Sequence, residues 1–287
     1  MRKVKEFIIE KLILICGLAS IFFVLLIFLF LLKEGLAVFK TVSPFKFLFG
    51  KSWYPISEPA QLGILPLILG SLMVTLGAAV ISVPIGVACA IYIAEVAPSK
   101  LKEILKSGIE LLAAIPSVVL GFIGMVTLVP WVKSMFKLPT GLTALSGAIM
   151  LAFMAMPTIV SIAEDALYSV PKSYKEGALA LGATQWQAIY RVMLPAASSG
   201  ILAAVMLGIG RVIGETMAVM MITGNAAVIP QSILVPVRTL TATIAAEMGE
   251  AVVGSEHYFA LFAVGIVLFV ISFAINVTAD LFLHKRH

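Results

Sequence analysis

Charged side chains are scarce in this chain. Asp, Glu, Lys and Arg make up 12% of its 287 residues, whereas hydrophobic types make up 61%. So few polar groups cannot cover the surface of a soluble domain, which excludes an ordinary soluble fold. The net charge of +5 comes from basic residues in the gaps between apolar runs, and no basic or aromatic cluster forms a face for nucleic acid. The composition therefore predicts an integral membrane protein that contacts lipid and binds no nucleic acid.

Cysteine and histidine are almost as rare. Cys16 and Cys89 lie alone in apolar runs, which excludes a disulfide framework or a zinc site of the usual spacing. His257, His284 and His287 show no metal-binding pattern either. No P-loop, dinucleotide fingerprint or nucleophile motif occurs. We therefore expect a chain that is not an enzyme and that holds no metal or cofactor of its own.

Six apolar stretches are long enough to cross a bilayer, whose apolar core takes about 20 residues of helix. They predict an all-α integral membrane protein with six transmembrane helices near Leu12–Leu32, Ile64–Ala94, Gly108–Val132, Leu142–Ala163, Ser199–Thr223 and Tyr258–Leu283. The first stretch exceeds the apolar region of a cleaved signal peptide, so we expect it to remain as a helix.

Basic residues favour one orientation of these spans. A cytoplasmic N-terminus places more than half of the Lys and Arg residues inside: Arg2, Lys3, Lys5, Lys11, Lys100, Lys102, Lys106, Lys172, Lys175, Arg191, Lys285 and Arg286. Cytoplasmic loops of membrane proteins carry such an excess. We therefore predict a multi-pass protein of the inner (cytoplasmic) membrane with both termini in the cytoplasm. The polar stretch around Glu176 then lies in the cytoplasm as well.

This polar stretch has the pattern of two short helices. Ser173-Tyr174-Lys175-Glu176 has the form of a capping box, which predicts a helix that starts at the serine. Gly182 suits the left-handed residue that ends such a helix. Thr184-Gln185-Trp186-Gln187 repeats the box and starts a second helix, which we expect to stop before Pro195. The pattern predicts a helical hairpin, either an ordinary amphipathic one at the membrane surface or a docking element.

The stretch also resembles a known motif. Glu176-Gly177-Ala178, three residues, Gly182, nine residues and Val192-Met193-Leu194-Pro195 are similar to the EAA loop of ABC importer permeases, with glycine replacing the middle alanine and valine replacing an isoleucine. The resemblance implies that the first helix is a coupling helix, seated in a cleft of a cytoplasmic ATPase dimer that binds ATP and Mg. It assigns ATPase coupling to Glu176, Gly177, Ala178, Gly182, Val192, Leu194 and Pro195.

Further segments extend the resemblance to the permeases of phosphate-specific transport (Pst) importers. They are Ile115–Val119, Glu164–Leu167, Val170-Pro171, Gly177–Thr184 and Gly210–Val219. Of the two homologous Pst permeases, the C subunit is the more similar, because Met-Ala-Val follows Gly-Glu-Thr here. The resemblance implies a type I ABC importer permease fold. Residues 1–62 would form an N-terminal helix and outer loop, and residues 63–287 a five-helix core with the coupling loop at 164–198.

The same resemblance implies partners and a substrate. A permease of this kind pairs with a homologous permease and couples to the ATPase dimer. It receives phosphate from an extracytoplasmic phosphate-binding protein, which the outer loops Lys33–Leu62 and Gly224–His257 would face. Alternating access would then import inorganic phosphate. An arginine in a span does not distinguish phosphate from sulfate, molybdate or a phosphonate, so another oxyanion stays open, as does a membrane-embedded lipid-modifying enzyme.

Arg211 and Glu215 lie inside the predicted fifth span, about 18 Å from its start at 1.5 Å per residue. Four residues apart, they share one face of the predicted helix. A charge at this depth costs at least about 2.5 to 3.5 kcal/mol and should face protein or water. One interpretation is an intrahelical ion pair, with Gly210 and Gly214 as a packing face. The other, favoured by the resemblance, is a substrate path in which Arg211 attracts the oxyanion while Glu215 positions the guanidinium and limits the dwell time.

Overall fold

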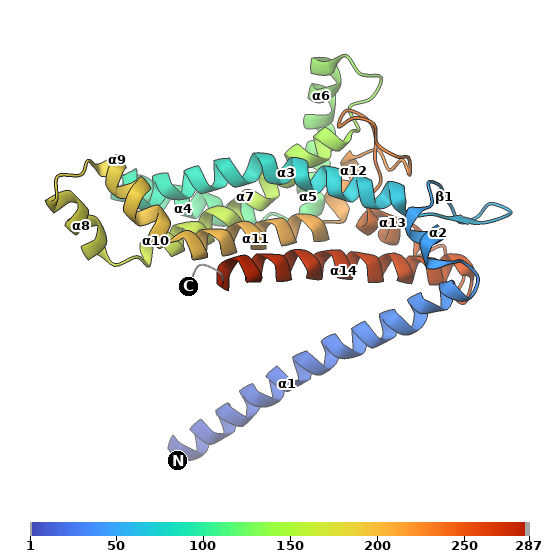
Figure 1. Cartoon of the computed structure of the whole chain (residues 1–287), viewed down its shortest axis with the longest axis horizontal. Coiled ribbons are helices and arrows are strands. Elements are labelled where there is room, and N and C mark those ends of the chain that lie inside the picture. Colours follow the sequence, from blue (N-terminus) through green and yellow to red (C-terminus); the bar gives the residue numbers. More distant parts are fainter. Residues whose placement is uncertain (1, 285–287) are drawn as a thin grey trace.

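The computed structural model describes the backbone of residues 2–284 and the side chains of residues 7 and 9–278. Long helices run side by side in one bundle (Figure 1). Its α-helices are α1 (Arg2–Gly35), α2 (Pro44–Phe49), α3 (Leu65–Ile91), α4 (Ser99–Ala114), α5 (Ser117–Val126), α6 (Leu128–Phe136), α7 (Ala144–Tyr168), α8 (Lys172–Ala180), α9 (Gln185–Ala188), α10 (Leu194–Ala196), α11 (Ser198–Gly214), α12 (Met217–Ile222), α13 (Leu240–Glu247) and α14 (Glu256–His284). The remaining elements are a 3₁₀ turn η1 (Leu36–Lys40), the strands β1 (Trp53–Tyr54) and β2 (Gln61–Leu62), and two π-helical turns, η2 (Tyr92–Val96) and η3 (Ile189–Met193).

Four predicted spans coincide with long apolar helices. Leu12–Leu32 lies within α1, Ile64–Ala94 corresponds to α3 and its continuation η2, Leu142–Ala163 to α7, and Tyr258–Leu283 to α14. Over the described part of the chain, five helical segments are long and apolar enough to cross a membrane by themselves. These are the four above and Ser117–Phe136. The all-helical membrane architecture is therefore confirmed.

The third span is shorter than predicted. Gly108–Val132 was expected to be one helix, but α4 ends at Ala114 and a new helix starts after Pro116. Proline disfavours helical geometry in the residue before it, and Ile115 is extended here (φ −69°, ψ 127°). The span therefore begins at α5 and continues into α6, whereas α4 is a separate amphipathic helix with no fully buried side chain.

The fifth span is not continuous either. α11 ends at Gly214, Glu215 is extended (φ −68°, ψ 132°), and α12 follows. Glycine weakens the end of the helix, and the Glu215 carboxylate accepts a hydrogen bond from the Ala218 amide (3.3 Å), a donor that has no partner within the first turn of α12. α11 reaches spanning length only together with the helical segment that precedes it, from which it bends by 70°.

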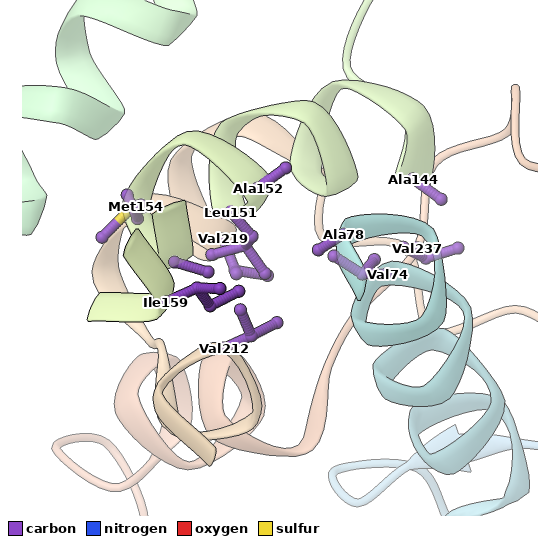
Figure 2. Close-up of a cluster of buried hydrophobic side chains, with 12 residues drawn as sticks. Val74, Ala78, Ala144, Leu151, Ala152, Met154, Ile159, Val212, Val219 and Val237 are labelled. Carbon is purple, nitrogen blue, oxygen red and sulfur yellow. The ribbon is translucent and has the colours of Figure 1, made fainter. Parts of the chain in front are cut away.

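The main core lies where α3, α7, α11 and α12 meet. Figure 2 shows Ile159 of α7 directed toward Val212 of α11 and Val219 of α12. Val74 and Ala78 of α3 belong to the same buried cluster. Inside a bilayer the lipid is as apolar as these side chains, so close van der Waals packing between them holds the four helices together.

The two ends of the bundle differ. α2, the β1–β2 hairpin and α13 gather at one end, whereas α8 and α9 project from the other, toward which the N-terminal part of α1 and the C-terminal part of α14 also point (Figure 1). Thus α8 and α9, the N-terminal part of α1 and the C-terminal part of α14 lie at the same end of the bundle. Five of the basic residues behind the orientation prediction, Arg2, Lys3, Lys5, Lys285 and Arg286, have side chains outside the described part.

α1 diverges from the bundle. It contacts α14 near its C-terminal end, where Phe30 lies 5.5 Å from Phe262 between ring centroids, and then leaves the other helices along its length (Figure 1). Within Ile9–Lys40, the most apolar stretch has no buried residue. This helix therefore presents an apolar surface that the rest of the chain leaves uncovered.

Candidate functional site

The polar stretch forms the predicted hairpin. Gly182 has φ +85°, the left-handed conformation that favours glycine, and ends the first helix. The Thr184 hydroxyl accepts a hydrogen bond from the Gln187 amide (3.3 Å), and the Gln187 side chain accepts one from the Thr184 amide (2.9 Å). This reciprocal pair is a capping box, so the predicted turn and second helix start are confirmed.

Two details of the predicted hairpin are wrong. α8 starts at Lys172 rather than at Ser173, and Pro171 precedes it without a side-chain cap. Proline fixes a backbone angle that suits the start of a helix, so the capping-box spacing at Ser173 goes unused. The second helix also continues past the expected stop, because η3 leads into α10 and Pro195 lies in the first turn of α10, where no amide donor is needed.

The residues assigned to ATPase coupling fall into two groups by exposure. Glu176, Gly177, Gly182 and Pro195 are exposed, whereas Ala178, Val192 and Leu194 are half-buried. No atom of the described chain would lie within 4 Å of a Cβ at Gly177 or Gly182. The front of the hairpin is thus open, and its second half rests on the bundle.

Large apolar side chains project from this hairpin without cover. Leu181 is 91% exposed, Tyr190 74%, Trp186 68% and Tyr174 53%. A soluble protein surface rarely leaves so many large apolar groups together in the open unless another molecule covers them. The hairpin therefore offers an apolar surface to another molecule, which fits both interpretations, a docking element and an amphipathic hairpin at the membrane surface.

A small apolar cluster fixes the hairpin to the bundle. Leu167 and Val170 at the end of α7 pack against Met193 of η3 and Ala197. Met193 is 3% exposed. No role was predicted for Met193, although its place between the motif residues Val192 and Leu194 was the available signal.

Ion pairs at this end of the bundle were also missed. The Glu164 carboxylate on α7 accepts hydrogen bonds from Lys102 and Lys106 of α4, both at 2.8 Å. Its side chain is 4% exposed. The hydrogen bond to Glu164 raises the pKa of Lys106, with further contributions from Asp165 and from the charge of Glu164. Lysines four residues apart on an amphipathic helix, near an acidic pair at the end of a span, were the sequence signal for this contact.

These pairs hold α4 against α7 together with the partly buried Leu105 and Ile109, since α4 has no fully buried side chain. We expect Glu164→Gln to raise the hydrogen-exchange rate of α4 amides by about tenfold. Hydrogen bonds to charged groups contribute about 1.5–3 kcal/mol, and solvent screening of the bond to Lys106 places the effect at the lower end of this range. Asp165→Asn is the matched control, because the Asp165 side chain is 69% exposed and makes one longer contact of 3.3 Å. Equal exchange in both variants would contradict this assignment.

Arg211 and Glu215 do not share a helix face, contrary to the prediction. Arg211 lies in the last turn of α11, and Glu215 lies beyond its end. Arg211 is exposed and donates one hydrogen bond, from Nη1 to the Thr158 hydroxyl of α7 (3.3 Å). Within residues 7 and 9–278, no ion pair joins Arg211 to Glu215, so the intrahelical ion pair is wrong. The break between α11 and α12 separates the two side chains.

The glycines of α11 occupy two different faces. A Cβ at Gly208 would lie 2.4 Å from Ile159 Cγ1, and one at Gly200 would lie 2.4 Å from Ala166 Cβ, so this face packs closely against α7. Gly210 and Gly214 have no such neighbour within 4 Å. They do not form a packing face within this chain. They lie, like Arg211, on the open side of the helix.

At the opposite end of the bundle, Glu247 of α13 joins three elements. Its carboxylate accepts hydrogen bonds from the Trp53 indole (3.0 and 3.2 Å) and from Arg238, and lies 2.9 Å from His257 Nε2. A cavity of about 580 Å³ opens beside this network. Within the described residues, no group of three or more His, Cys, Asp or Glu is placed to hold a metal ion.

Comparisons with known proteins show the class to which this helical membrane bundle with its projecting hairpin belongs. The model of the family "binding-protein-dependent transport system inner membrane component" matches residues 82–286. The chain belongs to this family of ABC importer permeases, which confirms the predicted class and the role of a non-catalytic transporter subunit. It is a multi-pass inner membrane protein.

Two named relatives show which permeases this chain is similar to. The chain is 44% identical to the probable ABC transporter permease protein YqgH of Bacillus subtilis over 260 residues, which cover 90% of this chain and 84% of that protein. It is 38% identical to the phosphate transport system permease protein PstC of Mesorhizobium japonicum over 250 residues, which cover 80% and 76%. The predicted resemblance to the C subunit of Pst importers is confirmed.

Solved structures share the fold. A chain of the inward-facing methionine ABC transporter MetNI aligns with a TM-score of 0.63 at 19% identity, covering 80% of this chain and 99% of that one. A chain of a bacterial alginate ABC transporter aligns with a TM-score of 0.66 at 17% identity, covering 94% and 93%. The predicted ABC importer permease fold is confirmed.

Proposed function

We propose that this chain is one of two permease subunits of an ATP-driven importer of inorganic phosphate. The position of Arg211 carries the proposal. Its guanidinium has five N–H donors, of which one binds Thr158, and it lies on the open face of α11 just before the helix break. A planar fork with free donors suits a tetrahedral oxyanion. The similarity to named phosphate permeases supports phosphate as that oxyanion.

Glu215 has a second role in this proposed path. It is half-buried at the same break, and its backbone carbonyl accepts a hydrogen bond from the Thr241 hydroxyl (2.8 Å). A carboxylate beside the route of an anion shortens the time for which the anion stays bound. It therefore favours release over retention, as transport requires.

Uptake by the reconstituted importer tests this assignment. Vesicles that hold the complete complex should take up radiolabelled phosphate only when ATP is supplied. Excess sulfate, molybdate or phosphonate should leave phosphate uptake unchanged. Strong competition by one of these anions would assign the chain to that oxyanion instead. A chain that assembles with no ATPase and takes up no oxyanion would favour the lipid-modifying alternative.

The hairpin α8–η3 is the proposed contact for the ATPase dimer. The exposed motif residues Glu176, Gly177 and Gly182 and the uncovered side chains of Leu181 and Trp186 support it. A rigid two-helix element transmits displacement from a soluble motor into the bundle. ATP and Mg are bound by the ATPase in this scheme, and this chain holds no cofactor. The half-buried motif residues Ala178, Val192 and Leu194, together with the exposed Pro195, join the contact to the spans.

The remaining partners follow from the two other uncovered surfaces. The apolar α1, apart from the bundle, supports packing against a homologous permease in the membrane. At the outer end, Ile56 is 83% and Val253 80% exposed, which supports docking of an extracytoplasmic phosphate-binding protein. Both termini are then cytoplasmic, like the hairpin. Residues 1–62 form the N-terminal helix and outer loop, and residues 63–287 the permease core.

A further inference from the structure

The coupling helix α8 is held weakly to the rest of the chain. None of its side chains is fully buried. Beneath it lies a cavity of about 340 Å³, lined by the ends of α3 and α7, by α8 and by Met193. Apolar packing therefore does not fix the distance between α8 and the spans, because the space between them is partly empty.

One ion pair crosses this gap. Lys175 Nζ of α8 lies 2.5 Å from Glu95 Oε2, which belongs to η2 at the end of α3. The Glu95 side chain is 8% exposed and that of Lys175 is 29% exposed. In the described part of the chain, it is the only ion pair between α8 and the spans. Salt screens a pair shielded in this way less than a surface pair, and removal of one partner leaves the other charge without compensation.

Glu95 lies at the end of α3, where a displacement of the ion pair would act on the spans. The π-helical turn η2 ends α3, and such turns often mark functional sites because their hydrogen bonding is irregular. The rest of α3 packs closely against α7, where Ile159 Cγ2 would lie 2.9 Å from a Cβ at Gly86. A displacement applied at η2 therefore acts on a helix that is built into the main core.

We propose that the Lys175–Glu95 ion pair is the strut that transmits movement of the coupling helix to α3. Lys175 immediately precedes Glu176 of the coupling motif, so a push from the ATPase on α8 reaches Glu95 through one charged contact. The adjacent cavity leaves room for α8 to move without clashing. Both residues are positioning residues. This inference rests on the proposed coupling of the hairpin to an ATPase dimer.

The test uses the complete reconstituted importer and measures phosphate uptake and ATP hydrolysis together. Glu95→Gln and Lys175→Gln should each lower the amount of phosphate taken up per ATP hydrolysed by about fivefold or more, the usual size of a coupling effect. The double variant Glu95→Lys with Lys175→Glu should return the ratio to within about twofold of the wild type, because the attraction is restored. Lys172→Gln is the matched control, since Lys172 lines the same cavity without an ion pair in the described part of the chain and should leave the ratio unchanged.

Several results would overturn the strut. They are an unchanged ratio in both single variants, a parallel loss of uptake and hydrolysis at constant ratio, or no recovery in the double variant. Hydrogen exchange supplies a measurement that does not involve phosphate. Glu95→Gln should raise exchange in α8 by about fivefold or more, and unchanged exchange would also count against the strut. Failure of the wild-type complex to transport phosphate would instead overturn the proposed function.

Discussion

Replacing Arg211 by glutamine is expected to reduce phosphate uptake by about tenfold or more, because a hydrogen bond to a charged group contributes about 1.5–3 kcal/mol. Glutamine keeps polar atoms at the position but loses the charge and the planar fork. The side chain is exposed and makes one hydrogen bond to the described residues, so folding and assembly should be unaffected. Uptake by reconstituted vesicles, with ATP hydrolysis measured in parallel, checks this prediction.

Two further variants separate charge from position. Arg211→Lys should keep part of the uptake, because the charge stays but the bidentate geometry is lost. Thr158→Val removes the hydroxyl that binds the guanidinium and should have a smaller effect, about twofold to threefold, since the cation remains. Wild-type uptake by Arg211→Gln in an assembled complex would remove Arg211 from the path.

Replacing Gly182 by valine is expected to detach the ATPase. Gly182 has φ +85°, and a β-branched residue in the left-handed region costs at least about 1–2 kcal/mol. The turn sets the angle between α8 and α9, so relief of this strain would move the two exposed faces that the ATPase is proposed to contact. A strain of this size corresponds to about a tenfold change in an equilibrium constant, since about 1.36 kcal/mol equals a factor of ten. Copurification of the ATPase with the membrane subunits should therefore fall by about tenfold.

Asparagine is the matched control at this position, because its short polar side chain tolerates the left-handed conformation. No atom of the described residues lies within 4 Å of a Cβ at Gly182, so any loss in the valine variant comes from the backbone and not from a clash. Gly182→Asn should therefore retain most of the ATPase. Equal retention by valine and asparagine would show that the turn does not control docking.

The hairpin shows what local sequence signals can and cannot give. Gly182 and the Thr184 box were predicted correctly, since a positive φ and a cap depend on a few neighbouring residues. The start at Ser173 was wrong because Pro171 offered a competing start two residues earlier. Met193 and Glu95 were missed as anchors, because their partners come from other parts of the chain.

The spans show the same limit at a larger scale. Apolar length located the four spans that coincide with α1, α3, α7 and α14, but it could not place the breaks within the third and the fifth. Pro116 carried a signal for the first of these breaks, which the long apolar run concealed. At the other break, Glu215 accepts hydrogen bonds from the Ala218 amide and the Thr241 hydroxyl, which replace part of the lost helical hydrogen bonding. Thr241 lies 26 residues further along the chain, in another helix.

The sequence by itself determined the membrane class, the four spans that coincide with α1, α3, α7 and α14, the hairpin turn at Gly182 and the permease family. Apolar length, backbone preference and motif spacing are properties of contiguous residues, so they can be read without a fold. Only the tertiary structure decided that Arg211 and Glu215 lie on separate elements and that Lys175 meets Glu95, 80 residues earlier. Both outcomes depend on hydrogen bonds and ion pairs between remote segments, which form only once the helices have packed.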